Sequence, residues 1–250
     1  MVENKQKCTE ELKYIVDILI LNGTITDCPG LVHGKTGIAI FFFHYARLTK
    51  NVLYEEYAND LVREILLQIH INSPADYKTG IAGIGVGLDY LLKNRFLNAD
   101  DDVFEDFDQR MVRAVLSDPW QDFSLYDGLA GYGRYWLMRL RHQPALESAR
   151  KCLLHIHACI DEQSITIPEN EKNDVNSFLR DLREISGFDV GAMQALPLSE
   201  QCQDVEKKRM TDLDMEKPLD NMGLLAGYAG EGMMRLTALN HTDMTWINLL

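Results

Sequence analysis

The sequence has few cysteines and no long apolar run. Its five cysteines, at positions 8, 28, 152, 159 and 202, form no C-x-x-C pair. Such scattered cysteines are typical of reduced thiols, so we expect a cytoplasmic protein. The first stretch, MVENKQKCTEELKYIVDILIL, carries acidic residues and lacks a small-residue cleavage site, which predicts an amphipathic helix and not a signal peptide. No apolar run approaches the roughly 18 residues that a membrane span needs.

Basic residues are also scarce. The chain has 25 Lys and Arg against 38 Asp and Glu, which gives a formal net charge of −13. This balance argues against nucleic acid as a partner, because neutralising phosphates requires clustered cations. An acidic surface would suit a basic peptide, although a solvated exterior is the commoner reason for such a charge.

Neither strands nor a phosphate-binding loop can be recognised. No segment alternates apolar and polar residues as a half-buried strand does, so the chain is predicted to be all-helical. The stretch GLVHGKTGIAIFF (30–42) looks at first like a phosphate-binding loop. That motif, G-x-x-x-x-G-K-[ST], needs its first glycine at position 29, where Pro29 stands. The glycines therefore need another explanation.

The same glycine pattern recurs along the chain. Further copies are DYKTGIAGIGVGLDYLL (76–92), SLYDGLAGYGRYWLMRL (124–140), GLLAGYAGEGMMRL (223–236) and, more weakly, GFDVGAMQAL (187–196). The copies align on one glycine each, namely Gly34, Gly80, Gly128, Gly191 and Gly227. All but the weak copy have a second glycine three residues later. Intervals of 46, 48, 63 and 36 residues are close to the length of a helical hairpin.

Each repeat predicts an inner and an outer helix. The segment IAIFFFHYARL (38–48) is apolar on all sides, which indicates a helix buried all round. The segment YEEYANDLVREILLQIHI (54–71) has one apolar stripe, which indicates a half-exposed outer helix. DDVFEDFDQRMVRAVL (101–116) repeats the outer pattern and opens with Asp102 and Glu105, spaced as a capping box. ALESARKCLLHIHACI (145–160) is the third outer helix.

The repeat glycines are expected to lie where inner helices converge. Side chains there would obstruct the approach of neighbouring first turns, so packing alone can explain each glycine. The same helix starts direct backbone amides and positive dipole ends toward one rim, which predicts a surface for an anion or a peptide carbonyl. We therefore expect the five aligned glycines to line a concave peptide-binding surface.

The pattern G-L-x-x-G-x-x-G, repeated from about Gly30 to Leu236, resembles the lanthionine synthetase C-like (LanC-like) family. The resemblance implies a single domain over residues 1–250, built as an α/α toroid of about five hairpins and shorter than is typical of the family. It also implies a site at the glycine-rich end. Family members use zinc there to activate a cysteine thiol, which adds to a dehydrated Ser or Thr of a precursor peptide.

The zinc ligands that the resemblance implies are not matched in this chain. The family's Trp-Cys-x-Gly and Cys-His-Gly turns place cysteines two residues, and a histidine one residue, before the repeat glycine. The positions two before hold Val32, Lys78, Tyr126, Asp189 and Leu225, and those one before hold His33, Thr79, Asp127, Val190 and Ala226. Only His33 matches in type, and it lies in the first repeat, where the family does not normally place a ligand. We therefore predict a member without a metal cofactor.

Metal ligands elsewhere are a weaker alternative. In CLLHIHAC, Cys152, His155 and Cys159 share one side of a predicted outer helix, where cysteines behave as small hydrophobic residues. Cys28 and His33, near the first glycine turn, would make only a partial site.

Polar residues beside the repeat glycines are the candidate catalytic groups: His33, Asp127 and Asp189. An aspartate at these positions suits a general base or an anchor for a peptide amine, and equally an N-cap that satisfies the helix start. Tyr126, Tyr132 and Tyr228 are candidate peptide-binding residues. Residues 161–186 predict a loop with Pro168 and then a helix from about Asp174, and the polar segment 198–221 predicts an exposed outer helix and a connection.

Three functions fit these patterns. We favour a LanC-like protein without zinc that binds peptides or acts as an accessory component of peptide modification. The alternatives are a peptide-modifying enzyme, either a cyclase with non-standard metal ligands or another α/α-barrel activity, and a non-catalytic scaffold for partner proteins. The expected partner is a peptide substrate or a protein, with neither nucleic acid nor a membrane span.

Overall fold

The computed structural model describes the chain apart from residues 1, 99–102, 121, 186–195, 197–221 and 240–241. In this described part every regular element is a helix and no strand occurs, which confirms the predicted all-α class. None of the described helices is long and apolar enough to cross a membrane.

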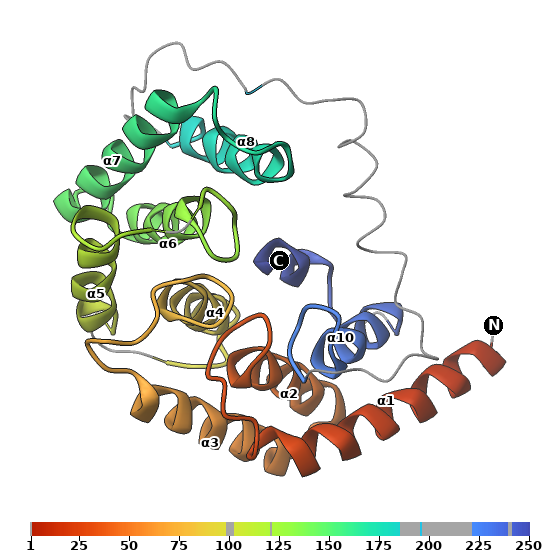
Figure 1. Ribbon diagram of the computed structural model, residues 1–250. Coiled ribbons are helices and arrows are strands. Elements are labelled where there is room, and N and C mark those ends of the chain that lie inside the picture. The colour runs from red at the N-terminus through yellow and green to blue at the C-terminus, as the bar shows by residue number, and fades with distance from the viewer. Residues whose placement is uncertain (1, 99–102, 121, 186–195, 197–221, 240–241) are drawn as a thin grey trace.

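The helices form two layers around one axis (Figure 1). The inner layer consists of α2 (Lys35–Thr49), α4 (Ile81–Lys93), α6 (Leu129–His142), α8 (Glu169–Arg183) and α10 (Tyr228–Ala238). The outer layer consists of α1 (Val2–Gly23), α3 (Val52–Gln68), α5 (Glu105–Leu116) and α7 (Glu147–Gln163). A short 3-10 helix, η2 (Thr245–Leu249), lies inside the inner layer. This arrangement is the predicted α/α toroid, and α1 packs chiefly on α10.

The burial pattern explains the two layers. Every residue of α2 from Lys35 to Ala46 is buried. The outer helix α3 buries only one stripe, which consists of Ala58, Leu61, Val62 and Ile65. An apolar helix has to be covered on all sides, whereas a helix with one stripe can keep its charged side in water.

The loop that enters an inner helix at a repeat glycine folds back over the first turn of that helix. Gly34, Gly80, Gly128 and Gly227 are the N-cap residues of α2, α4, α6 and α10. In each case an amide of the first turn donates a hydrogen bond to the carbonyl of the residue seven positions earlier in the chain. The pairs are Lys35–Cys28 (2.9 Å), Ile81–Pro74 (2.9 Å), Leu129–Asp122 (3.0 Å) and Ala229–Met222 (3.2 Å). These amides are satisfied within the chain, so the prediction that they are offered to an anion or a peptide carbonyl is wrong.

The second glycine of each repeat is required by the same returning loop. A Cβ atom added at Gly37, Gly83, Gly131 or Gly230 would lie less than 3.0 Å from the backbone carbonyl oxygen of the residue six positions earlier. Carbonyl oxygens of a hydrogen-bonded loop cannot move aside as a flexible side chain can. These second glycines therefore leave room for the carbonyl groups of the returning loop.

Hydrogen bonds between neighbouring loops join the inner helices to one another. The amide of Leu225 donates to the carbonyl of Val32, the amide of Val32 to that of Lys78, and the amide of Lys78 to that of Tyr126, each over 3.1 Å. All four residues occupy the same place in the repeat, two positions before the N-cap glycine. The glycine-rich loops thus form one continuous rim.

The inner helix α8 continues this series without a glycine loop of its own. Its carboxylates, Glu171 and Asp174, accept the backbone amides of Phe123 and Leu125 in the loop before α6, both over 2.9 Å. The ring of Phe178 lies where a side chain of Gly133 in α6 would be. The sequence pattern had assigned the fourth inner helix to the weak copy at Gly191, which lies outside the described residues.

The predicted start of α8 is wrong by five residues. The helix begins at Glu169, directly after Pro168, and not near Asp174. A proline fits at the very start of a helix, and the acidic residues of the first turn, Glu169 and Glu171, interact favourably with its dipole.

The predicted capping box at the start of α5 is also wrong. The helix begins at Glu105 with Phe104 as its N-cap residue, and no side chain accepts a capping hydrogen bond. Asp102 lies outside the described residues, as does the whole of segment 198–221.

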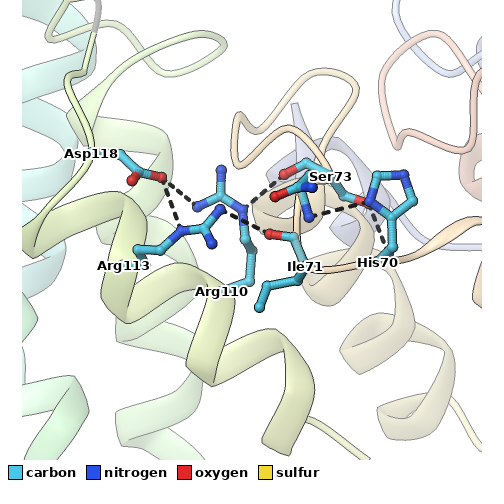
Figure 2. Close-up of polar contacts among 7 residues, drawn as sticks. His70, Ile71, Ser73, Arg110, Arg113 and Asp118 are labelled. Atoms are coloured by element: carbon cyan, nitrogen blue, oxygen red, sulfur yellow. Dashed lines mark hydrogen bonds and ion pairs between the residues drawn. The ribbon is translucent and has the colours of Figure 1, made fainter.

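Two arginines fasten the loop between α3 and α4 to the outer helix α5 (Figure 2). Arg110 donates to the carbonyl of Ser73 and Arg113 to that of Ile71, both over 2.9 Å. Both guanidinium groups pair with Asp118, at 2.9 and 3.5 Å. Since this loop leads directly into the glycine turn before α4, the cluster positions part of the rim.

One buried histidine joins two inner helices. His44 of α2 lies with Nε2 2.8 Å from the hydroxyl oxygen of Tyr90 in α4, and both side chains are buried. Burial, helped by the nearby charge of Arg47, lowers the pKa of His44 to about 4. The histidine is therefore neutral at physiological pH.

We predict that Gly83→Ala destabilises the fold by at least about 2 kcal/mol, because the new methyl group meets the carbonyl of Tyr77. The matched control is Gly87→Ala in the same helix, where the nearest atoms belong to the side chains of Thr36, Leu31 and Ile40. Urea unfolding should show the larger loss for Gly83→Ala. Equal losses would mean that the returning loop does not require the glycine.

We also predict an acid-dependent loss of stability that His44 causes. Between pH 6.5 and about 4 the unfolded chain binds a proton at this residue and the folded chain does not, so stability falls as the pH falls. The loss from this residue should reach about 2 kcal/mol near pH 4.5. Urea unfolding at pH 7 and at pH 4.5 gives the loss of unfolding free energy for the wild type and for His44→Gln, and the loss should be larger in the wild type. An identical pH dependence of the two proteins would contradict the assignment.

Candidate functional site

The centre of the toroid is filled by residues 242–250 of the chain, here called the central segment (Figure 1). Near the beginning of the segment, the hydroxyl group of Thr245 interacts with that of Tyr90, which lies in the carboxyl half of α4. Near the end of the segment, Leu250 contacts Tyr126 in the glycine-rich loop before α6. The segment thus runs from the carboxyl half of the inner helices to the glycine-rich rim.

Three consecutive backbone carbonyls of the central segment accept hydrogen bonds from the toroid. Arg134 Nη1 donates to the carbonyl of Asn248 over 2.9 Å, Tyr77 to that of Leu249 over 2.9 Å, and Tyr126 to that of Leu250 over 3.2 Å. The donors come from α6 and from two neighbouring glycine-rich loops. Because they bind main-chain oxygens, they place no demand on the side chains of the bound segment.

The buried donor Tyr77 keeps its proton. Tyr77 is completely buried, and burial raises its pKa although the guanidinium of Arg134 acts in the opposite direction. The same guanidinium lies over the Tyr77 ring, 5.9 Å from its centroid. A neutral phenol and a permanently charged guanidinium both present N–H or O–H groups to carbonyl oxygens at physiological pH.

Two apolar side chains anchor the central segment. Trp246 and Leu249 are 3 % and 5 % exposed, and they are separated by three residues, the repeat of a 3-10 helix. The indole Nε1 of Trp246 donates to the hydroxyl of Thr237 in α10 over 3.2 Å. Asn248, which lies between these two anchors in the chain, and Thr245, which precedes them, are exposed.

A cavity of about 540 Å³ lies beside the central segment. Its walls come from the carboxyl halves of α4, α6 and α8, together with Thr245, Asn248 and Leu249. The resemblance implied a site at the glycine-rich end, whereas this cavity opens toward the opposite ends of the helices.

Positive charge predominates in the cavity. Four basic residues, Lys93, Arg134, Arg141 and Arg180, and two acidic ones, Asp89 and Asp181, line it. Asp89 pairs with Lys93 at 2.7 Å and Asp181 with Arg180 at 3.8 Å. These pairs leave Arg134 and Arg141 as the excess positive charge of the walls. In a chain of net charge −13 this wall suits an acidic side chain better than a basic one.

Of the predicted peptide-binding tyrosines, only Tyr126 contacts the central segment. The charges around the Tyr132 hydroxyl are those of Asp76, Arg110, Asp118 and Asp122, on the side of the outer helix α5, and burial raises the pKa of Tyr132. Tyr228 faces Tyr14 of α1, and burial raises its pKa as well. The two tyrosines therefore lie toward the outer layer.

Two of the predicted catalytic residues, His33 and Asp127, do not come together. His33 lies beside Gly223 in the neighbouring loop, and Asp127 lies in the loop before α6, where its amide donates to Ser124 Oγ over 3.2 Å. The loop before α4 separates the two, as the order of the rim hydrogen bonds shows. Asp189 lies outside the described residues. Gly34, Gly80, Gly128 and Gly227 are buried N-cap residues, so Asp127 does not cap α6.

The described residues do not fit a zinc site of the family's kind. Val32, two residues before the first repeat glycine, is buried with its backbone engaged in the rim hydrogen bonds. Among the described residues no group of three or more His, Cys, Asp or Glu could hold a metal ion. Burial also raises the pKa of Cys28 and Cys159, and that of Cys152 to about 12, which keeps these thiols protonated.

Sequence reasoning missed two of the three donors, Tyr77 and Arg134. Tyr77 stands three residues before Gly80, close to the repeat position that drew attention to Tyr126. Arg134 interrupts the apolar stretch of α6, GLAGYGRYWLM. A charged side chain in a helix that is otherwise buried was the available signal, because such a charge needs a polar partner.

Comparison with known proteins agrees with this fold. A model of the family described as "Lanthionine synthetase C-like protein" matches residues 26–182, more than half of the chain. The matched region begins just before the first glycine-rich loop and ends in α8. No curated protein shows significant similarity to the chain. The repeated glycine loops, the two helical layers and this match together show that the chain belongs to the lanthionine synthetase C-like family.

Proposed function

We propose that the chain is a peptide-binding or accessory component of peptide modification, related to lanthipeptide cyclases but without a catalytic zinc ion. The observation that carries the proposal is the set of three donors, Arg134, Tyr77 and Tyr126, directed at the main-chain oxygens of three consecutive residues in the centre of the toroid. Main-chain hydrogen bonds supply affinity for a peptide, while neighbouring pockets select its side chains.

The cavity supports the same proposal. It adjoins the carbonyl-binding donors, since Tyr77 and Arg134 belong to its walls, and it has room for one or more side chains. The excess of arginine and lysine on these walls favours a peptide with an acidic residue. A basic peptide, which the net charge of the whole chain suggested, would be repelled here.

The proposal of a zinc-free protein rests on what occupies the rim. Val32, Lys78, Tyr126 and Leu225 stand two residues before the repeat glycine, the position that the resemblance implies for the cysteine ligands in two of the family's turns, and their backbones form the hydrogen bonds between loops. Activation of a substrate thiol would need a Lewis acid or a base at this place. His33 and Asp127 are separated by a loop, so these two described residues do not form an acid–base pair.

We predict that the purified full-length chain contains far less than one zinc ion per molecule by atomic emission spectroscopy, and that EDTA leaves its melting temperature unchanged. Stoichiometric zinc would contradict the proposal. A His33→Ala variant would then show whether the one residue that matches the family's ligand type holds the metal.

We further predict that the donors select peptides. The central segment covers the donors in the wild type. Random octapeptides displayed on phage are therefore selected on the variant Leu249→Asp, in which a carboxylate replaces the buried anchor and the segment is released. Adding Arg134→Ala or Tyr126→Phe to this variant should weaken binding of the selected peptides about tenfold. Tyr132→Phe, which removes a hydroxyl on the outer side, is the matched control. No enrichment, or equal binding by all variants, would refute the proposal.

A further inference from the structure

We infer that the central segment is an internal ligand of the toroid, and that an external peptide gains the site only by displacing it. This inference rests on the proposed function, because it names the ligand class and the regulation of the same site.

The contacts of the central segment are those of a bound peptide. Three backbone carbonyls in a row are held by donors of the toroid, and two apolar side chains, Trp246 and Leu249, are inserted between the inner helices. The described helices pack on one another without it, since α1, α2 and α10 are in mutual contact and α2, α4, α6 and α8 follow in series.

These contacts define the class of peptide that fits. It forms a single 3-10 turn with apolar side chains at positions i and i+3, as Trp246 and Leu249 do. Its carbonyls at i+2, i+3 and i+4 accept from Arg134, Tyr77 and Tyr126. The position corresponding to Asn248 borders the cavity and takes a polar or acidic side chain.

The cavity shows what displacement would open. Thr245, Asn248 and Leu249 form part of its wall, together with Tyr77 of the glycine-rich rim. Once the segment leaves, the space that it occupies beside Tyr126 joins the cavity. A peptide longer than the segment can then extend from the rim into the cation-lined cavity.

The tether makes the segment a strong competitor. It follows α10 after a connection of only a few residues, so its effective concentration at the site is on the order of millimolar. A free peptide with the same contacts at micromolar concentration cannot replace it. The apparent affinity is the intrinsic affinity reduced by the fraction of chains in which the site is open.

The experiment uses a fluorescein-labelled peptide DMTWINLL, the sequence of residues 243–250, and fluorescence polarisation with full-length chains. Leu249→Asp should release the segment and bind the peptide. The wild type should bind the labelled peptide at least about tenfold more weakly. The control Asn248→Ala changes an exposed side chain of the same segment and should bind the peptide as weakly as the wild type does. A peptide with alanine at the Trp and Leu positions should not bind Leu249→Asp.

Further measurements separate the possible failures. Circular dichroism melting shows whether Leu249→Asp is folded, and Trp246→Ala serves as a second release variant. Equal binding of the labelled peptide by the wild type and both release variants would overturn the inference but leave the proposed function intact. Folded release variants that bind phage-selected peptides but not DMTWINLL would also overturn it. Folded variants that bind neither would refute the proposed function as well.

Discussion

The return of each glycine-rich loop over the first turn of its own helix is the contact on which the toroid depends. A loop carbonyl accepts a hydrogen bond from an amide of the first turn seven residues later, where the glycine N-cap has no side chain to accept one, and a second carbonyl occupies the space of an absent Cβ atom. Because the loop is held so closely, its outer edge has one shape in every repeat. Neighbouring loops can then bond edge to edge, and the inner helices are set at regular positions around the axis.

The same contact decides where chemistry is possible. It uses one or two amides of each first turn within the chain, in the four glycine-rich loops that the structure describes, and so reduces the backbone donors that such helix ends offer elsewhere. Recognition at the centre therefore falls to side chains that project inward past the rim. Tyr77, Tyr126 and Arg134 have the length and the donor groups for this, and they reach the backbone of the central segment.

The sequence predicted the architecture well because that architecture is repetitive. The spacing of Gly34, Gly80, Gly128 and Gly227 marked four inner helices, and the uninterrupted apolar run of α2 distinguished an inner helix from an outer one. α8 was predicted as a helix but not as an inner one, because its link to the rim is made by the carboxylates of Glu171 and Asp174 and not by glycines. Long-range contacts of this type leave no periodic signal.

The site was predicted less well, for a physical reason. Proximity in sequence to a repeat glycine does not say to which side a residue points: Tyr126 faces the axis, whereas Tyr132 and Tyr228 face the outer layer. His33 and Asp127 stand at equivalent places in their repeats, yet equivalent places in a toroid are separated by rotation about the axis. The partner of Tyr77 and Tyr126 lies more than 100 residues away in the chain, and nothing in the repeat pattern refers to it.

The packing of α1 on α10 has a consequence for how the protein is made. The apolar stripe of α1, with Leu12, Ile15, Val16 and Leu19, is completed by a helix that begins only at Tyr228. At ribosomal rates of about 5 to 20 residues per second, that stripe stays partly uncovered for on the order of 10 s or more. During synthesis this stripe is accordingly the place where a nascent chain would attract a chaperone or aggregate, and closure of the circle is expected to be the last and slowest step of folding.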